Sequence, residues 1–196
     1  MSSPADPAPA AEEKKPRARI TLDDLTKFLG VIALVLGGGK YFYDKAEAAA
    51  HEAQSRSIAY IEAWGAEPLL GARETLYDFW AGQPDLISVF GTEALSRRQY
   101  AMMLQASLFR TNADAPIRAP LLVLDNFYSQ MSFCARAGLC DRAILDAYFC
   151  HVTRKNVVAY TPFYDRIRAA TGDRGIGRDM QGFAQDCPPE SPPPQG

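Results

Sequence analysis

The feature that most constrains this chain is an apolar run followed by three glycines and three aromatics, VIALVLGGGKYFYD at positions 31–44. A phosphate-binding loop has the pattern G-x-x-x-x-G-K-[ST]. Gly39 and Lys40 supply its GK pair, but Leu34 stands where the first glycine is required. Tyr41 stands where the metal-binding hydroxyl residue is required, so the sequence excludes a phosphate loop.

Three other interpretations of the run remain. A cleavable secretion signal would use the small-residue site AEA at 46–48, but Lys40, Asp44 and Lys45 separate that site from the apolar run. A buried core helix is favoured by length alone, because the uncharged window at 28–39 holds only 12 residues. The third interpretation is a membrane span.

The residues that flank the window favour the membrane span. Lys27 and Lys40 are able to extend toward lipid headgroups, and the aromatics at 41–43 are typical of a membrane interface. The 19 residues at 25–43 reach about 30 Å at about 1.5 Å per residue. We therefore predict a transmembrane anchor helix at residues 21–45, with a soluble core helix as the alternative.

One face of this helix carries small residues. Gly30, Ala33 and Gly37 follow i, i+3, i+7 spacing, which lets two membrane helices approach closely. The alternative is that glycine is simply common in membrane helices. These three residues are our candidate helix-packing interface, with a membrane protein complex and the lipid bilayer as the predicted partners.

Charge indicates the orientation of this anchor. Five cations precede the window and three follow it closely, and the positive-inside rule then places the N-terminus in the cytoplasm. We predict a single-pass protein of the cell inner membrane with a periplasmic C-terminal domain. The formal net charge of −2 argues against a nucleic-acid partner. The cations counted are Lys14, Lys15, Arg17, Arg19 and Lys27, then Lys40, Lys45 and Arg56.

The four cysteines all follow the anchor, at Cys134, Cys140, Cys150 and Cys187. An even number on that side suits disulfides in an oxidising compartment, and four cysteines allow three connectivities. The alternative is four buried thiols. Cys150-His151 resembles half a metal site, but neither it nor His51 has a suitably spaced partner, so we predict no metal. A nucleophilic pair of His151 with Cys134 or Cys140 is the enzymatic alternative.

Beyond the anchor, apolar residues recur at helical spacing and strand signals are almost absent. The predicted fold class is all-α, with the transmembrane helix continuing into a compact bundle of five or six helices at residues 46–172. Residues 1–20 are predicted to be a disordered tail, and residues 173–196 an irregular tail rich in Gly and Pro.

Several residues mark the helix boundaries. Gly65 should end the long first helix, and Ser96 should cap a later one. Gly138 should break the chain before Asp141 caps a helix at about 142–155. Thr161-Pro162 should then start a last helix that ends near Gly172.

The segments YIEAW, GARETLYDFW and LDNFYSQMSFCARAGLCDRAILDAYF resemble a group of uncharacterised bacterial proteins. That resemblance implies one membrane helix followed by a small helical domain of unknown function, over residues 25–165. It implies no activity, because the group has none assigned. The matching positions are Trp64, Arg73, Leu76, Phe127, Gly138, Asp141 and Phe149.

The sequence shows no catalytic constellation and no cofactor motif. We therefore predict a non-enzymatic accessory or assembly subunit of a larger membrane complex. One alternative is a membrane-tethered ligand-binding or sensor module, which would need an apolar pocket with convergent polar groups. The other is a thiol-dependent enzyme, which would need a reactive cysteine.

Overall fold

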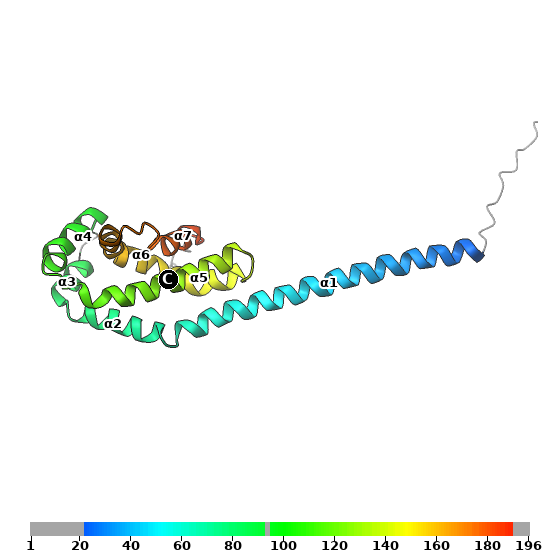
Figure 1. The fold of residues 1–196 in the computed structure, drawn as a ribbon, viewed down its shortest axis with the longest axis horizontal. Helices are drawn as coiled ribbons and strands as arrows, with labels where there is room; N and C mark the ends of the chain where they lie inside the picture. Colours follow the sequence, from blue (N-terminus) through cyan, green and yellow to red (C-terminus); the bar gives the residue numbers. More distant parts are fainter. Residues whose placement is uncertain (1–21, 93–94, 190–196) are drawn as a thin grey trace, which may run out of the picture. The chain divides into compact units, whose positions relative to one another are not determined.

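The computed structural model describes residues 22–92 and 95–189, and all the regular structure in those ranges is helical (Figure 1). The predicted all-α class is therefore confirmed. The elements are α1 (Leu22–Trp64), α2 (Leu69–Ala81), α3 (Pro84–Thr92), α4 (Arg97–Leu104), the π-turn η1 (Gln105–Phe109), the 3₁₀ turn η2 (Ala115–Ile117), α5 (Arg118–Arg136), α6 (Arg142–Thr171) and α7 (Arg178–Asp186).

Contacts within the chain divide it into two compact units, residues 1–46 and residues 47–196. Helix α1 contributes to both, because it runs without a break up to Trp64, as the sequence predicted. The second unit also contains α2 to α7. The tail predicted for residues 1–20 lies outside the described residues, as do residues 190–196 of the C-terminal tail.

Side-chain caps and glycines set the helix ends at the predicted positions. The Ser96 hydroxyl accepts a hydrogen bond from the Gln99 N–H, and the Gln99 side chain accepts one from the Ser96 N–H. The Asp141 carboxylate accepts from the Ala143 N–H at 2.9 Å at the start of α6. Gly172 ends α6 in the left-handed region, with a φ of 76° that costs a side-chain-bearing residue more.

Helix α6 corrects one sequence prediction. We expected two helices, at about 142–155 and from Thr161 onward, because proline usually begins a helix. The structure has one helix of 30 residues with Pro162 inside it. Pro162 lacks an N–H, so the Val158 carbonyl loses its helical donor. Val158 is 70% exposed, so this break in the hydrogen-bond pattern lies at the surface of the bundle.

Helix α7 corrects a second prediction, because residues 173–196 were expected to be irregular. This short helix packs against α5 and α6 (Figure 1). Its Met180 and Phe183 side chains are buried. Asp179 fixes the helix on α5, where its carboxylate accepts a hydrogen bond from Ser129 at 2.6 Å and pairs with Arg136 at 3.1 Å. Tertiary packing therefore stabilises a glycine-rich segment whose own helix propensity is low.

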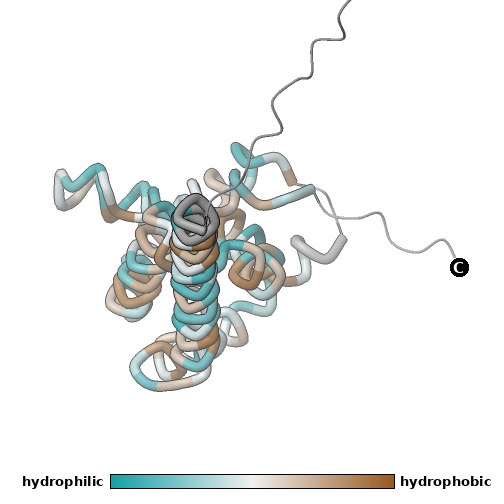
Figure 2. Tube along the Cα trace, turned by 90° about the vertical axis from the view of Figure 1, so that its right-hand side faces the viewer, coloured by the Kyte–Doolittle hydropathy of each residue, from teal (hydrophilic) through white to brown (hydrophobic). Residues whose placement is uncertain are grey.

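The core of the second unit is built around aromatic rings. Trp64, at the end of α1, lies 5.3 Å from the Phe127 ring and 5.7 Å from the Phe149 ring, measured between centroids. Figure 2 shows hydrophobic positions recurring between hydrophilic ones along the helices, as amphipathic packing requires. Most of the aromatic residues between positions 60 and 164 belong to this core or pack against it.

Two buried polar residues, Ser57 and Asp114, connect segments that surround this core. The Ser57 hydroxyl on α1 accepts a hydrogen bond from the Asp141 N–H at 2.8 Å, which holds the start of α6 against α1. Asp114, 1% exposed, pairs with Arg118 at 3.0 Å and with Arg166 at 3.3 Å. Its charge is therefore compensated, as burial requires.

Candidate functional site

The first unit carries large apolar side chains that are exposed to solvent. Leu34 is 78% exposed and Phe42 is 71% exposed. Within the part of the chain that the structure describes, no helix is both long enough and apolar enough to cross a membrane. The exposed side chains still give α1 an apolar surface, which we call the apolar segment of α1: Leu29, Leu34, Val35, Leu36, Tyr41, Phe42 and Tyr43.

The candidate packing residues lie within this segment. Gly30, Ala33 and Gly37 are exposed on α1, and their spacing places them on one side of a helix with 3.6 residues per turn. A Cβ atom added at Gly30 or Gly37 would meet no other atom within 4 Å. The space that a neighbouring helix would need is thus present, and the packing itself stays a prediction.

The structure pairs all four cysteines of the chain. Cys134 bonds to Cys140 across the turn between α5 and α6, and Cys150 on α6 bonds to Cys187 at the end of α7. The sequence alone had left all three possible connectivities open. No cysteine is a free thiol, so a thiol-dependent activity would first require reduction of one pair.

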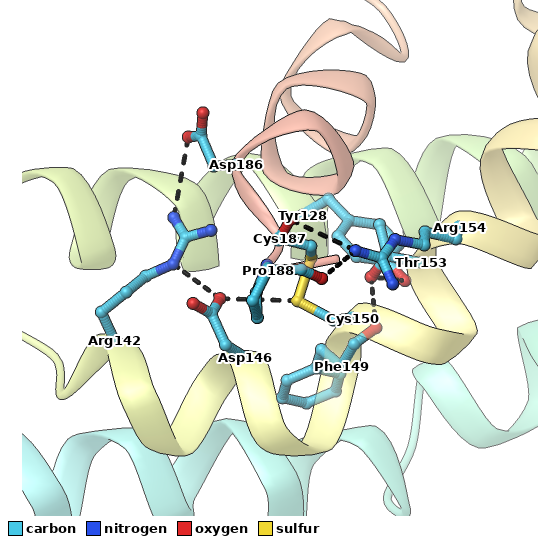
Figure 3. Close-up of a disulfide and its surroundings, with 10 residues drawn as sticks. All are labelled: Tyr128, Arg142, Asp146, Phe149, Cys150, Thr153, Arg154, Asp186, Cys187 and Pro188. Carbon is cyan, nitrogen blue, oxygen red and sulfur yellow. Dashed lines mark hydrogen bonds and ion pairs between the residues drawn. A yellow bond between two sulfur atoms is a disulfide. The ribbon is translucent and has the colours of Figure 1, made fainter. Parts of the chain in front are cut away.

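Polar side chains surround the Cys150–Cys187 bond (Figure 3). Arg142 pairs with Asp146 at 2.6 Å and with Asp186 at 3.8 Å, which ties the start of α6 to the end of α7. Arg154 donates to the Cys187 carbonyl at 3.2 Å and to the Pro188 carbonyl. The chain leaving α7 is therefore held on α6 by one covalent bond and two hydrogen bonds.

The same region contains a group that resembles a metal site in composition. Ligand atoms of Asp146, Cys150 and Cys187 lie within 4.8 Å of one another. Two of the three are disulfide sulfurs, whereas cysteine binds a metal as a thiolate. The geometry is that of a disulfide beside a carboxylate that is already paired with Arg142.

The second unit carries a groove of about 900 Å³, between α2, α3, α4 and α6. Its aromatic lining residues are Trp80, Tyr100 and Tyr160, of which the two tyrosines are largely buried. Its other apolar lining residues are Ile87, Leu95, Val158 and Ala159, and its polar ones are Arg97, His151, Arg154, Lys155 and Asn156. We call it the α4–α6 groove.

The charged side chains that line the α4–α6 groove all have the same sign. Every ionisable side chain among the described lining residues, apart from the two tyrosines, is basic. Burial raises the pKa of both Tyr100 and Tyr160, so neither phenol adds negative charge at neutral pH. The Tyr100 hydroxyl donates to the Ala159 carbonyl at 2.7 Å, which fixes α4 against α6. The groove therefore suits an occupant with apolar groups and negative charge.

Sequence reasoning missed this groove. Arg97 lines the groove, whereas the neighbouring Arg98 is not among the lining residues. His151, the histidine of the possible cysteine–histidine pair, also lines the groove. The signal in the sequence was HVTRKNVVAY at 151–160, where a basic helical turn at 151–155 is followed by an apolar turn at 157–160.

Two other candidate residues have plain structural surroundings. His51 is exposed and lies 3.9 Å from Glu47 on the same face of α1. Arg73 stacks 4.4 Å from the Trp64 ring centre and donates to the Trp64 carbonyl at 2.9 Å. Asp125 accepts from the Gly177 N–H.

Comparison with known proteins adds no relative: no protein-family model, curated protein or solved structure matches this chain.

Proposed function

We propose that this protein is a non-enzymatic accessory or assembly subunit of a larger membrane complex. The observation that supports this proposal is the exposed apolar segment of α1. Apolar surface left in water costs about 25 cal/mol per Å² relative to burial. Large exposed patches of this kind mark contacts with proteins or membranes.

The proposed contact joins this segment to membrane helices of the partner. The uncharged residues 28–39 rise about 18 Å, less than the roughly 30 Å of a hydrocarbon core. Partner helices packed on the face formed by Gly30, Ala33 and Gly37 would bury that face of α1. Lys27 and Lys40 would reach the headgroups at the two ends.

The disulfides support the predicted orientation. Disulfides form and persist outside the reducing cytoplasm. We therefore propose that the bundle lies in the periplasm and the N-terminus in the cytoplasm of a bacterial inner membrane. Both pairs lie in the second unit, which this orientation exposes to oxidising conditions.

A matched pair of variants tests the packing face. Gly37→Leu should abolish co-purification of a stoichiometric partner in mild detergent, because leucine would fill the space between the helices. Gly39→Leu is the control, since two residues further along α1 the same substitution points away from that face. Equal partner recovery with both variants, or a lone monomer with the unaltered chain, would count against the proposal.

Thiol labelling of intact cells tests the compartment. A membrane-impermeant reagent should label the protein only after an impermeant reductant has been added, because the bundle faces outward with its cysteines paired. Labelling that requires lysis of the cells would place the bundle in the cytoplasm.

The α4–α6 groove favours a second candidate, a membrane-tethered ligand-binding or sensor module. Its volume of about 900 Å³ falls in the range of small-molecule sites. Native mass spectrometry of the purified chain would detect a retained small molecule, and the absence of any bound mass would favour the first candidate.

A further inference from the structure

The α6 wall of the α4–α6 groove changes from basic to apolar along its length. His151 and Lys155 lie at its start, and Val158 and Ala159 follow about one helical turn after Lys155. Residues three and four apart on a helix are neighbours on its surface, so the basic and the apolar side chains form two adjoining patches of one wall. An occupant that follows α6 must therefore carry its charge at one end and its apolar part at the other.

A second helix adds positive charge to this groove. Arg97, in the first turn of α4, lies one turn before Tyr100, whose hydroxyl donates to the Ala159 carbonyl on α6. Arg97 and Lys155 are both exposed, and neither forms an ion pair with another residue that the structure describes. Both cations are therefore available to bind an anionic headgroup through charge-assisted hydrogen bonds.

The apolar part of the groove suits an alkyl chain better than an aromatic ring. Tyr100 is 7% exposed and Tyr160 is 8% exposed, so neither ring has much surface on which another ring could stack, and Trp80 is itself partly buried. The aliphatic side chains are more open, since Ile87 is 45% exposed and Val158 is 70% exposed. Contact with an alkyl chain is favourable in proportion to the apolar area that it removes from water.

We propose that the α4–α6 groove binds one single-chain lipid with an anionic headgroup. Arg97 and Lys155 bind the headgroup, and the alkyl chain lies along Val158 and Ile87. The groove volume of about 900 Å³ falls in the range of sites for a single small molecule. This inference rests on the second candidate function, the ligand-binding module, and adds the class of ligand. It is independent of the proposed accessory role.

Photolabelling of the full-length chain at neutral pH in an uncharged maltoside detergent tests the proposal. The probe is palmitic acid that carries a diazirine on its alkyl chain, and the matched probe is the corresponding uncharged alcohol. Mass spectrometry maps the labelled peptides. The acid should label peptides from residues 151–160 and from α3 or α4, with one molecule per chain at saturation, and unlabelled palmitic acid should compete. The alcohol should label them about fivefold less, because it offers the two cations no anion.

A matched pair of variants tests the role of charge. Arg97→Glu should lower labelling of the groove by the acid about fivefold, because it replaces an attraction by a repulsion. Arg98→Glu is the control, since Arg98 is also exposed in the first turn of α4 but does not line the groove. The control should leave the labelling unchanged. An equal loss in both variants, or no loss in either, would overturn the proposal.

The two probes separate this inference from the function on which it rests. Equal labelling of the groove by the alcohol and the acid would overturn the anionic headgroup and leave the ligand-binding module standing. No competed labelling of the groove by either probe would overturn both. Several molecules of the acid per groove at saturation would also overturn the proposal, since they would indicate a surface that gathers lipid rather than a site for one molecule.

Discussion

At the scale of single residues, Gly177 is the position where this fold depends most directly on the absence of a side chain. It adopts a φ of 78°, and an added Cβ would lie 2.7 Å from Cγ of the buried Tyr164. Its N–H donates to the Asp125 carboxylate at 2.7 Å, which fixes the start of α7 on α5. Close approach of the backbone to Tyr164 therefore explains why glycine stands here.

Gly177→Ala should lower the free energy of unfolding by roughly 2–5 kcal/mol, the sum of left-handed strain and overpacking. Gly172→Ala is the control, because Gly172 has a φ of 76° but no atom within 4 Å of its added Cβ. It should cost only the strain, roughly 1–2 kcal/mol. Urea denaturation measures both, and equal losses would show that contact with Tyr164 is unimportant.

Asp125 should make stability depend on pH. Burial raises the pKa of its carboxyl group above 3.8, although the hydrogen bond from Gly177 lowers it in part. Because its pKa in the folded state lies above the value in the unfolded state, Asp125 contributes stability that is fully present below pH 3.8. That stability is lost as the pH rises through the folded-state pKa. Asp125→Asn keeps the acceptor oxygen and removes the charge.

This variant should therefore gain stability relative to the unaltered chain as pH rises from the acid range to neutral. Urea denaturation of both proteins at several pH values measures the difference. A difference that does not change with pH would show that the pKa of Asp125 is not raised in the folded state.

At the scale of elements, the two disulfides perform different tasks. Cys134–Cys140 closes a turn with a sequence separation of 6, between helices that already follow each other. Cys150–Cys187 spans a separation of 37 and fixes α7, a nine-residue helix, onto α6. An isolated helix of that length is unstable in water, so α7 relies on this attachment and on its buried Met180 and Phe183.

Replacing Cys150 and Cys187 with alanine should cost roughly 4 kcal/mol of stability, and replacing Cys134 and Cys140 roughly 2 kcal/mol, because a longer closed loop restricts the unfolded chain more. Each double variant loses two sulfur atoms, so the pairs serve as controls for each other. Urea denaturation without reductant gives the two values. The reverse order would contradict the assigned pairing or its entropic effect.

At the scale of the whole molecule, the chain combines a unit that has little burial with a unit that has its own core. The described large apolar side chains of α1 before residue 46 are exposed, whereas Leu121, Leu145 and Met180 in the second unit are inaccessible to solvent. A unit with its own core should fold without the rest of the chain.

A chain of residues 47–196 should therefore be a helical monomer that unfolds cooperatively and stays dispersed without detergent. Its thermal midpoint should lie within a few degrees of that of the full-length protein. Circular dichroism and size-exclusion chromatography measure these properties. Aggregation or loss of helix in the shorter chain would mean that residues before 47 contribute to the bundle.

Much of the local structure could be predicted because short-range chemistry decides it. The Ser96 and Asp141 side chains cap helices through hydrogen bonds that span three residues or fewer, and both were predicted correctly. Gly138 and Gly172 adopt positive φ values where the sequence placed breaks. Pro162 failed as a signal because a proline's effect depends on what surrounds the freed carbonyl, and that is a tertiary property.

The sequence by itself determined the all-α class, most helix ends and the apolar character of residues 28–39, since periodicity, caps and hydropathy are local properties. Only the tertiary structure decided which cysteines pair, that residues 178–186 form a helix, and that Arg97 and the 151–160 segment share one groove. Each of these depends on contacts between residues far apart in the chain. Such contacts form where packing makes burial favourable, and a one-dimensional pattern does not specify that packing.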